Sequence, residues 1–403
     1  MPLLRASWLL ALTLALLPAV LFTASAADGD VRIDAAFPGG NIIVERMEGD
    51  TVFLQQDLRE TRGQWFYWCF RVRGAAGRTL TFNFTRGNSV GTRGPAMSSD
   101  DGLTWRWLGT ERAKPTTFTH AFPPKSGDVL FSVGMTYTEQ NFRAFVTRVG
   151  GKPGFTIGTL GRSEKGRNVE LLRIGKLEGT PAHRVAITAR HHACEMMASY
   201  VLEGMIEGVL AGDETGRWHR ENVAFLIVPF MDKDGVEEGL QGKNRTPHDP
   251  CRDYLGESLY RNVAAMKKLL PAWSEGRLRI ALDLHCPTLR GKNADRIHLV
   301  GGLDPEIWKA ATRFGEVLAA TQAGPLVYRP QDNLPHGMAW NTLSDRRSFN
   351  LWAATLPGIN FSTTLEFPFA SVGDQVVDAD SSRRFGRDLA RAIREYLMTE
   401  VAQ

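Results

Sequence analysis

The chain has 403 residues, a formal net charge of +4 and an ordinary globular composition, with 43% hydrophobic and 23% charged residues. Its positive charge is spread without a long basic run, which argues against a nucleic acid as the main partner. Four cysteines are too few for the disulfide framework of a small secreted protein. We therefore expect a folded protein with a large core, and its length favours two domains.

The first 26 residues have the features of a cleavable secretory signal. Arg5 lies in a short basic segment, an apolar run extends from Leu9 to Phe22, and small residues follow at positions 24–26. This run is too short to span a membrane comfortably, and no later stretch approaches the ~18 apolar residues that a transmembrane helix needs. We expect an exported, periplasmic or secreted protein whose mature chain carries no transmembrane segment.

From residue 27 to residue 158 the chain consists of short, alternating, aromatic-rich segments separated by glycine, proline and polar turns. Strands are predicted at residues 41–45, 51–55, 65–72, 80–83, 105–108 and 129–135. Short strands at this spacing predict an N-terminal antiparallel β-sandwich domain. The sequence assigns no role to this domain.

From residue 159 to residue 403 the predicted strands alternate with longer amphipathic helices. Strands are predicted at 184–189, 223–230, 278–284, 296–300 and 359–366, and helices at 193–211, about 255–270, 305–321 and 382–399. This alternation predicts an α/β domain, in which a mostly parallel mixed sheet has helices on both faces. Functional sites in such folds lie at the carboxyl ends of the strands.

The segment that ends the first of these strands reads A-R-H-H-A-C-E. In the first turn of a helix His192 and Glu195 would share one face, with Cβ atoms roughly 5–6 Å apart. An imidazole and a carboxylate so placed can bind one zinc ion. The spacing fits equally well an ordinary helix N-terminus with an acid near the positive end of the dipole. A third ligand is therefore needed to decide between the two interpretations.

Polar residues at later strand ends offer that ligand. One apolar strand ends in D-L-H, where Asp283 and His285 need a polar or metal partner. The last strand ends in T-T-L-E and places Glu366 where a base could act on a water that zinc activates. The loop between the motifs contains Arg245 and Arg252, whose guanidinium groups suit a carboxylate, although solvated surface arginines are the alternative.

Together these segments resemble the zinc metallocarboxypeptidases of peptidase family M14, in particular the cytosolic carboxypeptidase-like branch, which pairs a β-sandwich with the catalytic domain. The resemblance rests on A-R-H-H-A-C-E against R-x-H-P-G-E, D-P-C-R-D-Y against D-x-N-R-D, D-L-H-C against D-L-H-G, and T-T-L-E, in the family's order and spacing. The first half adds G-Q-W-F-Y-W-C-F-R-V, N-F-T-R and G-P-A-M-S-S-D-D-G-L-T-W. The resemblance thus covers nearly all of the mature chain.

The resemblance implies one zinc ion per chain, bound by His192, Glu195 and His285. It implies that Glu366 is the general base. On the same alignment His191 supports the ligands without being one of them.

The resemblance also implies roles for the loop between the ligand motifs. Arg252 matches the arginine that binds the substrate's terminal carboxylate, and Arg245 matches the one that stabilises the oxyanion. Cys251 stands where the family has asparagine, which replaces one hydrogen-bond partner of that carboxylate by a weak thiol donor. Cys194 and Cys286 also lie beside these motifs, and a disulfide between two of the three cysteines remains an open alternative.

We therefore predict an exported zinc metallocarboxypeptidase that removes C-terminal residues from peptides or proteins through a zinc-activated water. One alternative is an amidohydrolase of N-acyl amino acids or cell-wall peptides on the same fold. Another is a catalytically impaired peptide-binding protein, indicated by Cys251 and by the lack of a tyrosine between Leu334 and Pro357. If Arg329, Arg346 and Arg347 are more than surface arginines, they suggest an acidic side chain at the substrate's C-terminus.

Overall fold

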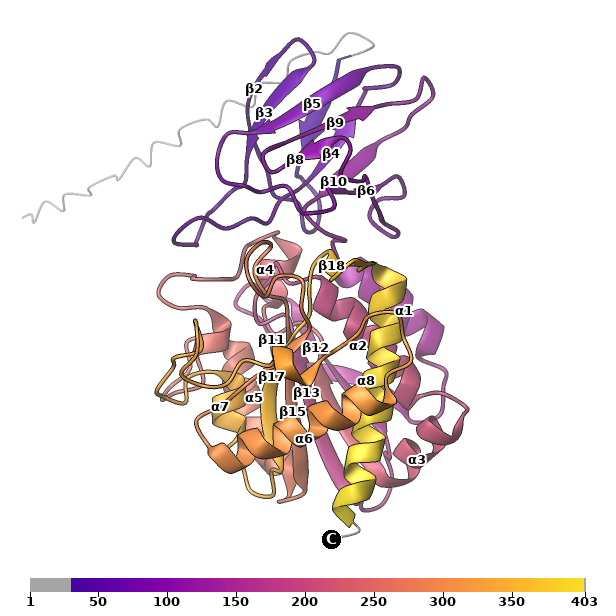
Figure 1. Cartoon of the computed structure of the whole chain (residues 1–403), viewed down its shortest axis with the longest axis vertical. Helices are drawn as coiled ribbons and strands as arrows, with labels where there is room; N and C mark the ends of the chain where they lie inside the picture. Colours follow the sequence, from indigo (N-terminus) through magenta and orange to yellow (C-terminus); the bar gives the residue numbers. More distant parts are fainter. Residues whose placement is uncertain (1–29, 402–403) are drawn as a thin grey trace, which may run out of the picture. The chain divides into compact units, whose positions relative to one another are not determined.

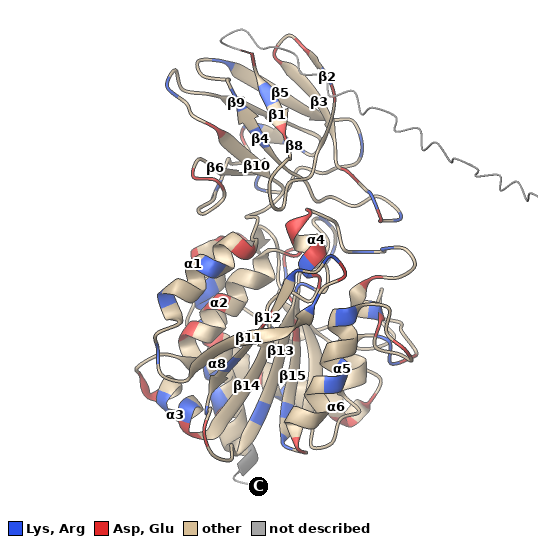
Figure 2. Ribbon diagram, turned by 180° about the vertical axis from the view of Figure 1, so that it is seen from behind, with Lys and Arg blue, Asp and Glu red and all other residues tan. Residues whose placement is uncertain are grey.

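The computed structural model describes residues 30–401, so the predicted signal segment 1–26 lies outside the described residues. Within this range, no helix is both long enough and apolar enough to cross a lipid bilayer. Figure 2 shows acidic and basic residues interspersed along outer helices, as the sequence pattern indicates.

The first half of the described chain forms two five-stranded sheets (Figure 1). Their orders are β1-β4-β10-β6-β7 and β2-β3-β5-β9-β8, and all neighbouring strands are antiparallel except β3 and β5. The strands are β1 (Arg32–Asp34), β2 (Ile43–Glu48), β3 (Thr51–Gln55), β4 (Cys69–Arg73), β5 (Thr79–Phe84), β6 (Ala96–Ser98), β7 (Arg106–Trp107), β8 (Ala113–Lys114), β9 (Thr117–Ala121) and β10 (Val129–Ser132).

Alternate residues of β3, β5 and β9 are buried, and all residues of β10 are buried. In β5 the buried side chains include Leu80 and Phe82, which are both 0% exposed. The ring of Phe82 packs 5.3 Å from that of Phe70 on β4 and 5.5 Å from that of Phe131 on β10. This aromatic core, shared by strands of both sheets, makes the predicted β-sandwich.

The second half forms a seven-stranded mixed sheet in the order β11-β12-β14-β13-β15-β17-β16. The four central strands β14, β13, β15 and β17 are parallel, and the outer pairs are antiparallel. The strands are β11 (Phe155–Arg162), β12 (Asn168–Gly175), β13 (His183–Ala189), β14 (Val223–Val228), β15 (Leu278–His285), β16 (His298–Val300) and β17 (Phe361–Glu366), and β18 (Ser371–Val372) pairs with β19 (Gln375–Val376) in a separate hairpin. The predicted mixed sheet is confirmed.

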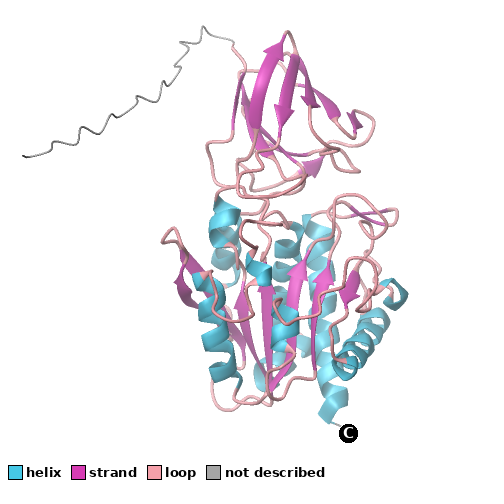
Figure 3. Cartoon of the chain, turned by 90° about the vertical axis from the view of Figure 1, so that its left-hand side faces the viewer, coloured by secondary structure: helices cyan, strands magenta, loops and turns pink. Residues whose placement is uncertain are grey.

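Helices cover both faces of this sheet (Figure 3). They are α1 (Glu139–Val149), α2 (Met197–Val209), α3 (Glu214–Asn222), α4 (Lys233–Glu237), α5 (Arg261–Ser274), α6 (Pro305–Thr321), α7 (Phe349–Ala353) and α8 (Ala379–Val401), with short 3-10 turns at Pro250–Arg252 and Pro330–Asp332. In β13, Val185 and Ile187 belong to the core shared with α2, α6 and α8, whereas Ala186 belongs to the core shared with α5 and α7. Because both faces are buried, these strands read as continuous apolar runs.

Some elements differ from the sequence-based expectation. Helix α2 begins at Met197, not at residue 193, so Glu195 precedes the helix. The edge strand β11 was not predicted because most of its residues are exposed and it lacks a regular apolar alternation. Helices α1 and α3 were also not predicted, and α3 buries only Gly216 and His219. The boundary at residue 158 between two domains remains a prediction.

Candidate metal centre

The parallel register of the central strands brings the predicted site residues to one edge of the sheet. Strands β13, β15 and β17 are neighbours, and Ala189 at the end of β13 pairs with Leu284 on β15. His285, the last residue of β15, pairs in register with Glu366, the last residue of β17. The carboxyl ends of three strands therefore present His285, Glu366 and the segment after β13 to the same region.

The segment after β13 turns sharply before α2 begins. Arg190 has a left-handed backbone with φ of 60°, a conformation that costs energy for a residue other than glycine. Its buried guanidinium donates to the carbonyl of Tyr137 and the hydroxyl of Ser199, both at 3.0 Å, and to the carbonyl of Ala193. These bonds hold the turn that contains His192 and Glu195. The two residues thus lie in a loop ahead of the helix, which corrects the expectation of a helical first turn.

Three candidate ligand residues converge in this loop and at the end of β15. His192 Nδ1 lies 3.0 Å from Glu195 Oε1, His285 Nδ1 lies 2.8 Å from Glu195 Oε2, and the two Nδ1 atoms are 3.2 Å apart. Tetrahedral ligands about 2.0–2.1 Å from a zinc ion would be separated by about 3.3 Å. All three residues are buried, so the cluster is a compact set of donors around one point.

The orientation of these groups also fits a cation. Glu195 Oε2 is buried and, although close to His285 Nδ1, has no hydrogen-bond partner in the described chain. His285 Nδ1 and Glu195 Oε2 face each other without a hydrogen bond, and His192 Nδ1, which is bonded to Glu195 Oε1, lies within reach of the same point, so the three groups are arranged as ligands of a shared ion. Two histidines and one carboxylate are also a known donor set of catalytic zinc, which keeps a fourth position open. The residues present therefore fit zinc.

Asp283 is hydrogen-bonded to Nε2 of His285, the ring nitrogen that does not face Glu195. Its carboxylate, 1% exposed, lies 2.6 Å from His285 Nε2, 2.8 Å from His191 Nδ1 and 2.8 Å from the donating hydroxyl of Thr188. Burial alone would raise the pKa of Asp283, but His191 and His285 outweigh it and hold that pKa well below its usual range. The ionised carboxylate accepts a hydrogen bond from the N–H at Nε2 and leaves the lone pair of His285 Nδ1 free for a metal.

Lys243 is a feature of the centre that the sequence interpretation missed. Its ammonium lies 2.6 Å from Glu195 Oε1, donates to the carbonyl of Cys286 at 3.2 Å, and lies 5.4 Å from the ring centre of Trp65. Burial would raise the pKa of Glu195, but Lys243 and the two histidines outweigh it and hold that pKa well below its ordinary value. Only the position of Lys243 in the loop between the ligand motifs could have drawn attention to it.

Asp249 is a second missed residue. Its Oδ1 lies 3.5 Å from His192 Nε2, on the side of the ring away from the ligand cluster. Burial alone would lower the pKa of His192, but the carboxylates of Glu195 and Asp249 outweigh it and raise that pKa to about 9. Asp249 thus faces the second ring nitrogen of His192, but at a longer distance than Asp283 from His285 and without a hydrogen bond.

A hollow opens beside the ligand cluster. Its lining residues are His192, Cys251, Arg252, His285, Val300, Trp340, Asn341, Leu343, Ser348, Asn350, Leu351, Thr364 and Glu366. Glu366 is 6% exposed, and its Oε2 has no hydrogen-bond partner among the described residues. Arg252 contacts the sulfur of Cys251 at 3.7 Å but has no carboxylate within 4.0 Å in the described chain. The hollow thus combines an unpaired guanidinium, a carboxylate with a free oxygen and two of the ligands.

The structure places Arg245 differently from Arg252. The Arg245 guanidinium forms a two-pronged ion pair with Asp232, with N–O distances of 2.6 and 3.1 Å, and does not line the hollow. Its role at an oxyanion remains a prediction. All four cysteines are buried free thiols, which answers the open question of a disulfide in the described chain.

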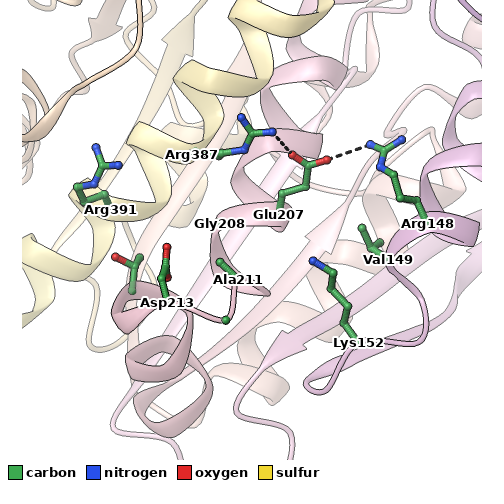
Figure 4. A pocket seen from close by; sticks show the side chains of 11 residues that line it. Arg148, Val149, Lys152, Glu207, Gly208, Ala211, Asp213, Arg387 and Arg391 are labelled. Carbon is green, nitrogen blue, oxygen red and sulfur yellow. Dashed lines mark hydrogen bonds and ion pairs between the residues drawn. The ribbon is translucent and has the colours of Figure 1, made fainter.

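A separate hollow of about 480 Å³ lies between the end of α1, helix α2, the turn after α2, and α8 (Figure 4). Glu207 lies at its centre and pairs with Arg148 at 3.0 Å and with Arg387 at 2.7 Å. None of its described lining residues is a histidine or cysteine, and none belongs to the ligand cluster. The larger hollow therefore has no part in the candidate metal centre.

Known proteins are similar to this chain in sequence or in fold. Residues 148–263 match the family model described as zinc carboxypeptidase. An uncharacterised protein of Zymomonas mobilis is 30% identical over 219 residues, which are 52% of this chain and 55% of that protein. Cytosolic carboxypeptidase 2 of Macaca fascicularis is 27% identical over 265 residues, which are 55% of this chain and 31% of that protein. The crystal structure of a metallo-carboxypeptidase from Burkholderia cenocepacia has a TM-score of 0.75 at 22% identity, covering 92% of this chain and 99% of that one.

The mixed sheet and the family match together indicate a domain of the zinc carboxypeptidase type. The chain is thus similar to zinc carboxypeptidases over residues 148–263, and to cytosolic carboxypeptidases over about half of its length. The matched family segment contains His192, Glu195, Arg245 and Arg252, whereas His285 lies beyond it. The matched region spans about half of the first curated relative and about a third of the second, so the activities of those whole proteins do not transfer directly.

Proposed function

We propose that the chain is an exported zinc metallocarboxypeptidase that hydrolyses the last peptide bond of a peptide or protein. The observation that carries this proposal is Arg252, which lines the same hollow as His192, His285 and Glu366 and has no carboxylate partner within 4.0 Å in the described chain. A guanidinium without an acid partner suits an anionic ligand, and its planar fork matches a carboxylate. Only the last residue of a peptide offers a free α-carboxylate.

A carboxylate bound by Arg252 would determine which peptide bond reaches the ligand cluster. Holding the end of the substrate converts a collision between molecules into a reaction within one complex. Zinc, when bound by His192, Glu195 and His285, supplies a Lewis acid that polarises the carbonyl and lowers the pKa of water to about 7. The binding of one end thus explains why the enzyme would act on terminal residues.

Glu366 is the group proposed to move protons in this reaction. It is held in register beside His285, and its buried Oε2 lacks a hydrogen-bond partner among the described residues. A buried acceptor without a partner is costly, which favours a partner supplied by water or substrate. Glu366 would take a proton from the attacking water and deliver it to the leaving amine.

The test uses two peptides that differ only in a C-terminal acid or amide. The purified protein with zinc should release the last residue from the acid, and cleave the amide at least about 100-fold more slowly, as expected when a charged hydrogen bond is lost. Arg252→Gln should abolish this preference, whereas Arg347→Gln, in an exposed arginine paired with Asp345, should preserve it. Equal cleavage of acid and amide by the wild type would contradict an exopeptidase.

Glu366→Gln tests the proton carrier separately. The variant should retain about one zinc ion per chain, because Glu366 is not among the three proposed ligands, and should lose turnover. Metal analysis and product chromatography measure the two properties. Turnover at the wild-type rate would contradict the role of Glu366.

Two alternatives of the same fold remain to be separated by experiment. An amidohydrolase would act on N-acyl amino acids or cell-wall peptides, which also offer a free carboxylate to Arg252. A catalytically impaired peptide-binding protein is favoured by Cys251, whose sulfur lies 3.7 Å from Arg252 where the family has an amide. Products released from mixtures of peptides, N-acyl amino acids and muropeptides identify the first alternative, and zinc binding without any cleavage identifies the second.

Export is the part of the proposal that rests on the sequence alone. The basic segment, apolar run and small residues within residues 1–26 support a signal that is removed on secretion. N-terminal sequencing of protein recovered from the periplasm or the medium should begin near Ala27. Recovery only inside the cell with an intact N-terminus would contradict export.

A further inference from the structure

We propose that the side chain of the substrate's last residue is uncharged and apolar, and that Trp340 is the residue that covers it. This inference rests on the proposed carboxypeptidase function and names its substrate class. It starts from the part of the hollow that is lined by residues outside the ligand cluster, among them Trp340, Leu343 and Leu351.

The wall of this part contains no ionised side chain besides the groups already assigned to metal, base and carboxylate. Its apolar members are Val300, Leu343 and Leu351. Of the arginines that suggested an acidic substrate, none lines the hollow, and Arg347 pairs with Asp345. The structure thus does not support a cation dedicated to a second carboxylate.

The polar members of the wall are uncharged, and two of them, Asn341 and Ser348, already donate hydrogen bonds within the protein. The amide of Asn341 donates to the carbonyl of Gly301 at 2.9 Å and to that of Leu334 at 3.3 Å. The hydroxyl of Ser348 donates to Asn350 Oδ1 at 2.7 Å. The amide of Asn341 and the hydroxyl of Ser348 thus donate within the protein and not to a substrate.

A charged side chain would therefore lack a partner in this wall. An acidic side chain would compete with the terminal carboxylate for Arg252, and a basic one would find only Glu366, the proposed proton carrier. Burial of a charge without a partner is strongly unfavourable, whereas apolar groups gain from contact with Val300 and Leu351. The wall selects against both kinds of charge.

Trp340 lies at the mouth of this wall with 54% of its surface exposed. It belongs to a turn in which Gly337 and Asn341 are joined by a 2.8 Å backbone hydrogen bond, and Ala339 has a left-handed backbone with φ of 49°. The anchored amide of Asn341 holds this turn in place. A large indole held exposed beside a hollow offers apolar area that a ligand can cover.

The test measures kcat and KM for N-acetylated tripeptides Ala-Ala-Xaa in which Xaa is leucine, valine, phenylalanine, glutamate or lysine. The three apolar substrates should exceed the glutamate and lysine substrates in kcat/KM by about 100-fold or more. Trp340→Ala should raise KM for the apolar substrates by about 10-fold with little change in kcat, and Trp340→Phe should restore most of the loss.

Met338→Ala is the matched control. Met338 is 57% exposed on the same turn but does not line the hollow, so its loss should leave both constants unchanged. Glutamate or lysine substrates cleaved as well as leucine, or Trp340→Ala equal to wild type, would overturn this inference and leave the carboxypeptidase function standing. Failure to cleave any of the five substrates would overturn the proposed function itself, and this inference with it.

Discussion

Replacing Asp283 by asparagine tests whether the carboxylate that is hydrogen-bonded to the proposed ligand His285 increases the affinity of the centre for zinc. Asp283 faces His285, His191 and Thr188 at 2.6–2.8 Å and is 1% exposed. A hydrogen bond to an ionised group contributes about 1.5–3 kcal/mol, and one between neutral groups about 0.5–1.5 kcal/mol. An amide of the same shape should therefore weaken the support of His285 by about 1–2 kcal/mol, which corresponds to about 5–30-fold. This range overlaps the typical effect of outer partners on metal affinity, about 10–100-fold.

The assay is a titration of the metal-free protein with zinc against a competing chelator near neutral pH. Asp388→Asn is the matched control, because Asp388 is also a buried carboxylate but does not belong to the ligand cluster. Asp388 accepts hydrogen bonds from the backbone N–H groups of Ala323 and Gly324. It should lower stability and leave zinc affinity unchanged. A zinc affinity of Asp283→Asn within about two-fold of wild type, or an equal loss in Asp388→Asn, would refute the reasoning.

Three further predictions concern charge and pH. Lys243→Met should lower the stability of the metal-free protein by about 3 kcal/mol, because the carboxylate of Glu195 loses a buried partner. Zinc should restore most of that loss. An equal loss with and without zinc in urea denaturation would contradict this prediction. Zinc affinity should rise with pH up to about 9, because His192, whose pKa is raised to about 9 in the metal-free protein, must lose its proton to bind zinc. A chelator titration that showed no pH dependence of zinc affinity between neutral pH and pH 9 would contradict this prediction. Burial lowers the pKa of His219 to about 4 from 6.5, so its contribution to stability is present above pH 6.5 and is lost as the pH falls through about 4. His219→Gln should remove up to about 3 kcal/mol of this acid sensitivity, and identical pH profiles for variant and wild type would count against it.

The class of fold and the candidate ligands could be predicted because both are local features of the sequence. Apolar runs of strand length between amphipathic helices indicate a sheet buried on two faces. His285 and Glu366 immediately end such runs, and His192 and Glu195 follow the end of another. Parallel neighbouring strands carry their ends to one edge, so strand-end polar residues were expected to meet there.

The parts that were missed depend on loops without a regular pattern. The turn from Arg190 to Glu195 adopts a left-handed backbone at its first residue, and no periodicity in the sequence indicates that α2 starts only at Met197. The sequence also did not indicate that the guanidinium of Arg245, whose role at an oxyanion stays a prediction, pairs with Asp232 thirteen residues earlier. A loop's path follows from the particular hydrogen bonds that satisfy it, and these are not encoded in spacing.

The sequence by itself predicted a sheet buried on both faces and the polar residues at the ends of its strands. Both predictions depend on patterns within a few neighbouring positions. Only the tertiary structure shows that Lys243 contacts Glu195 and that Arg245 pairs with Asp232 and does not line the hollow. It also shows that Trp340 is exposed where it lines the hollow. Each of these features brings together residues from separate loops, whose meeting depends on packing over long distances along the chain.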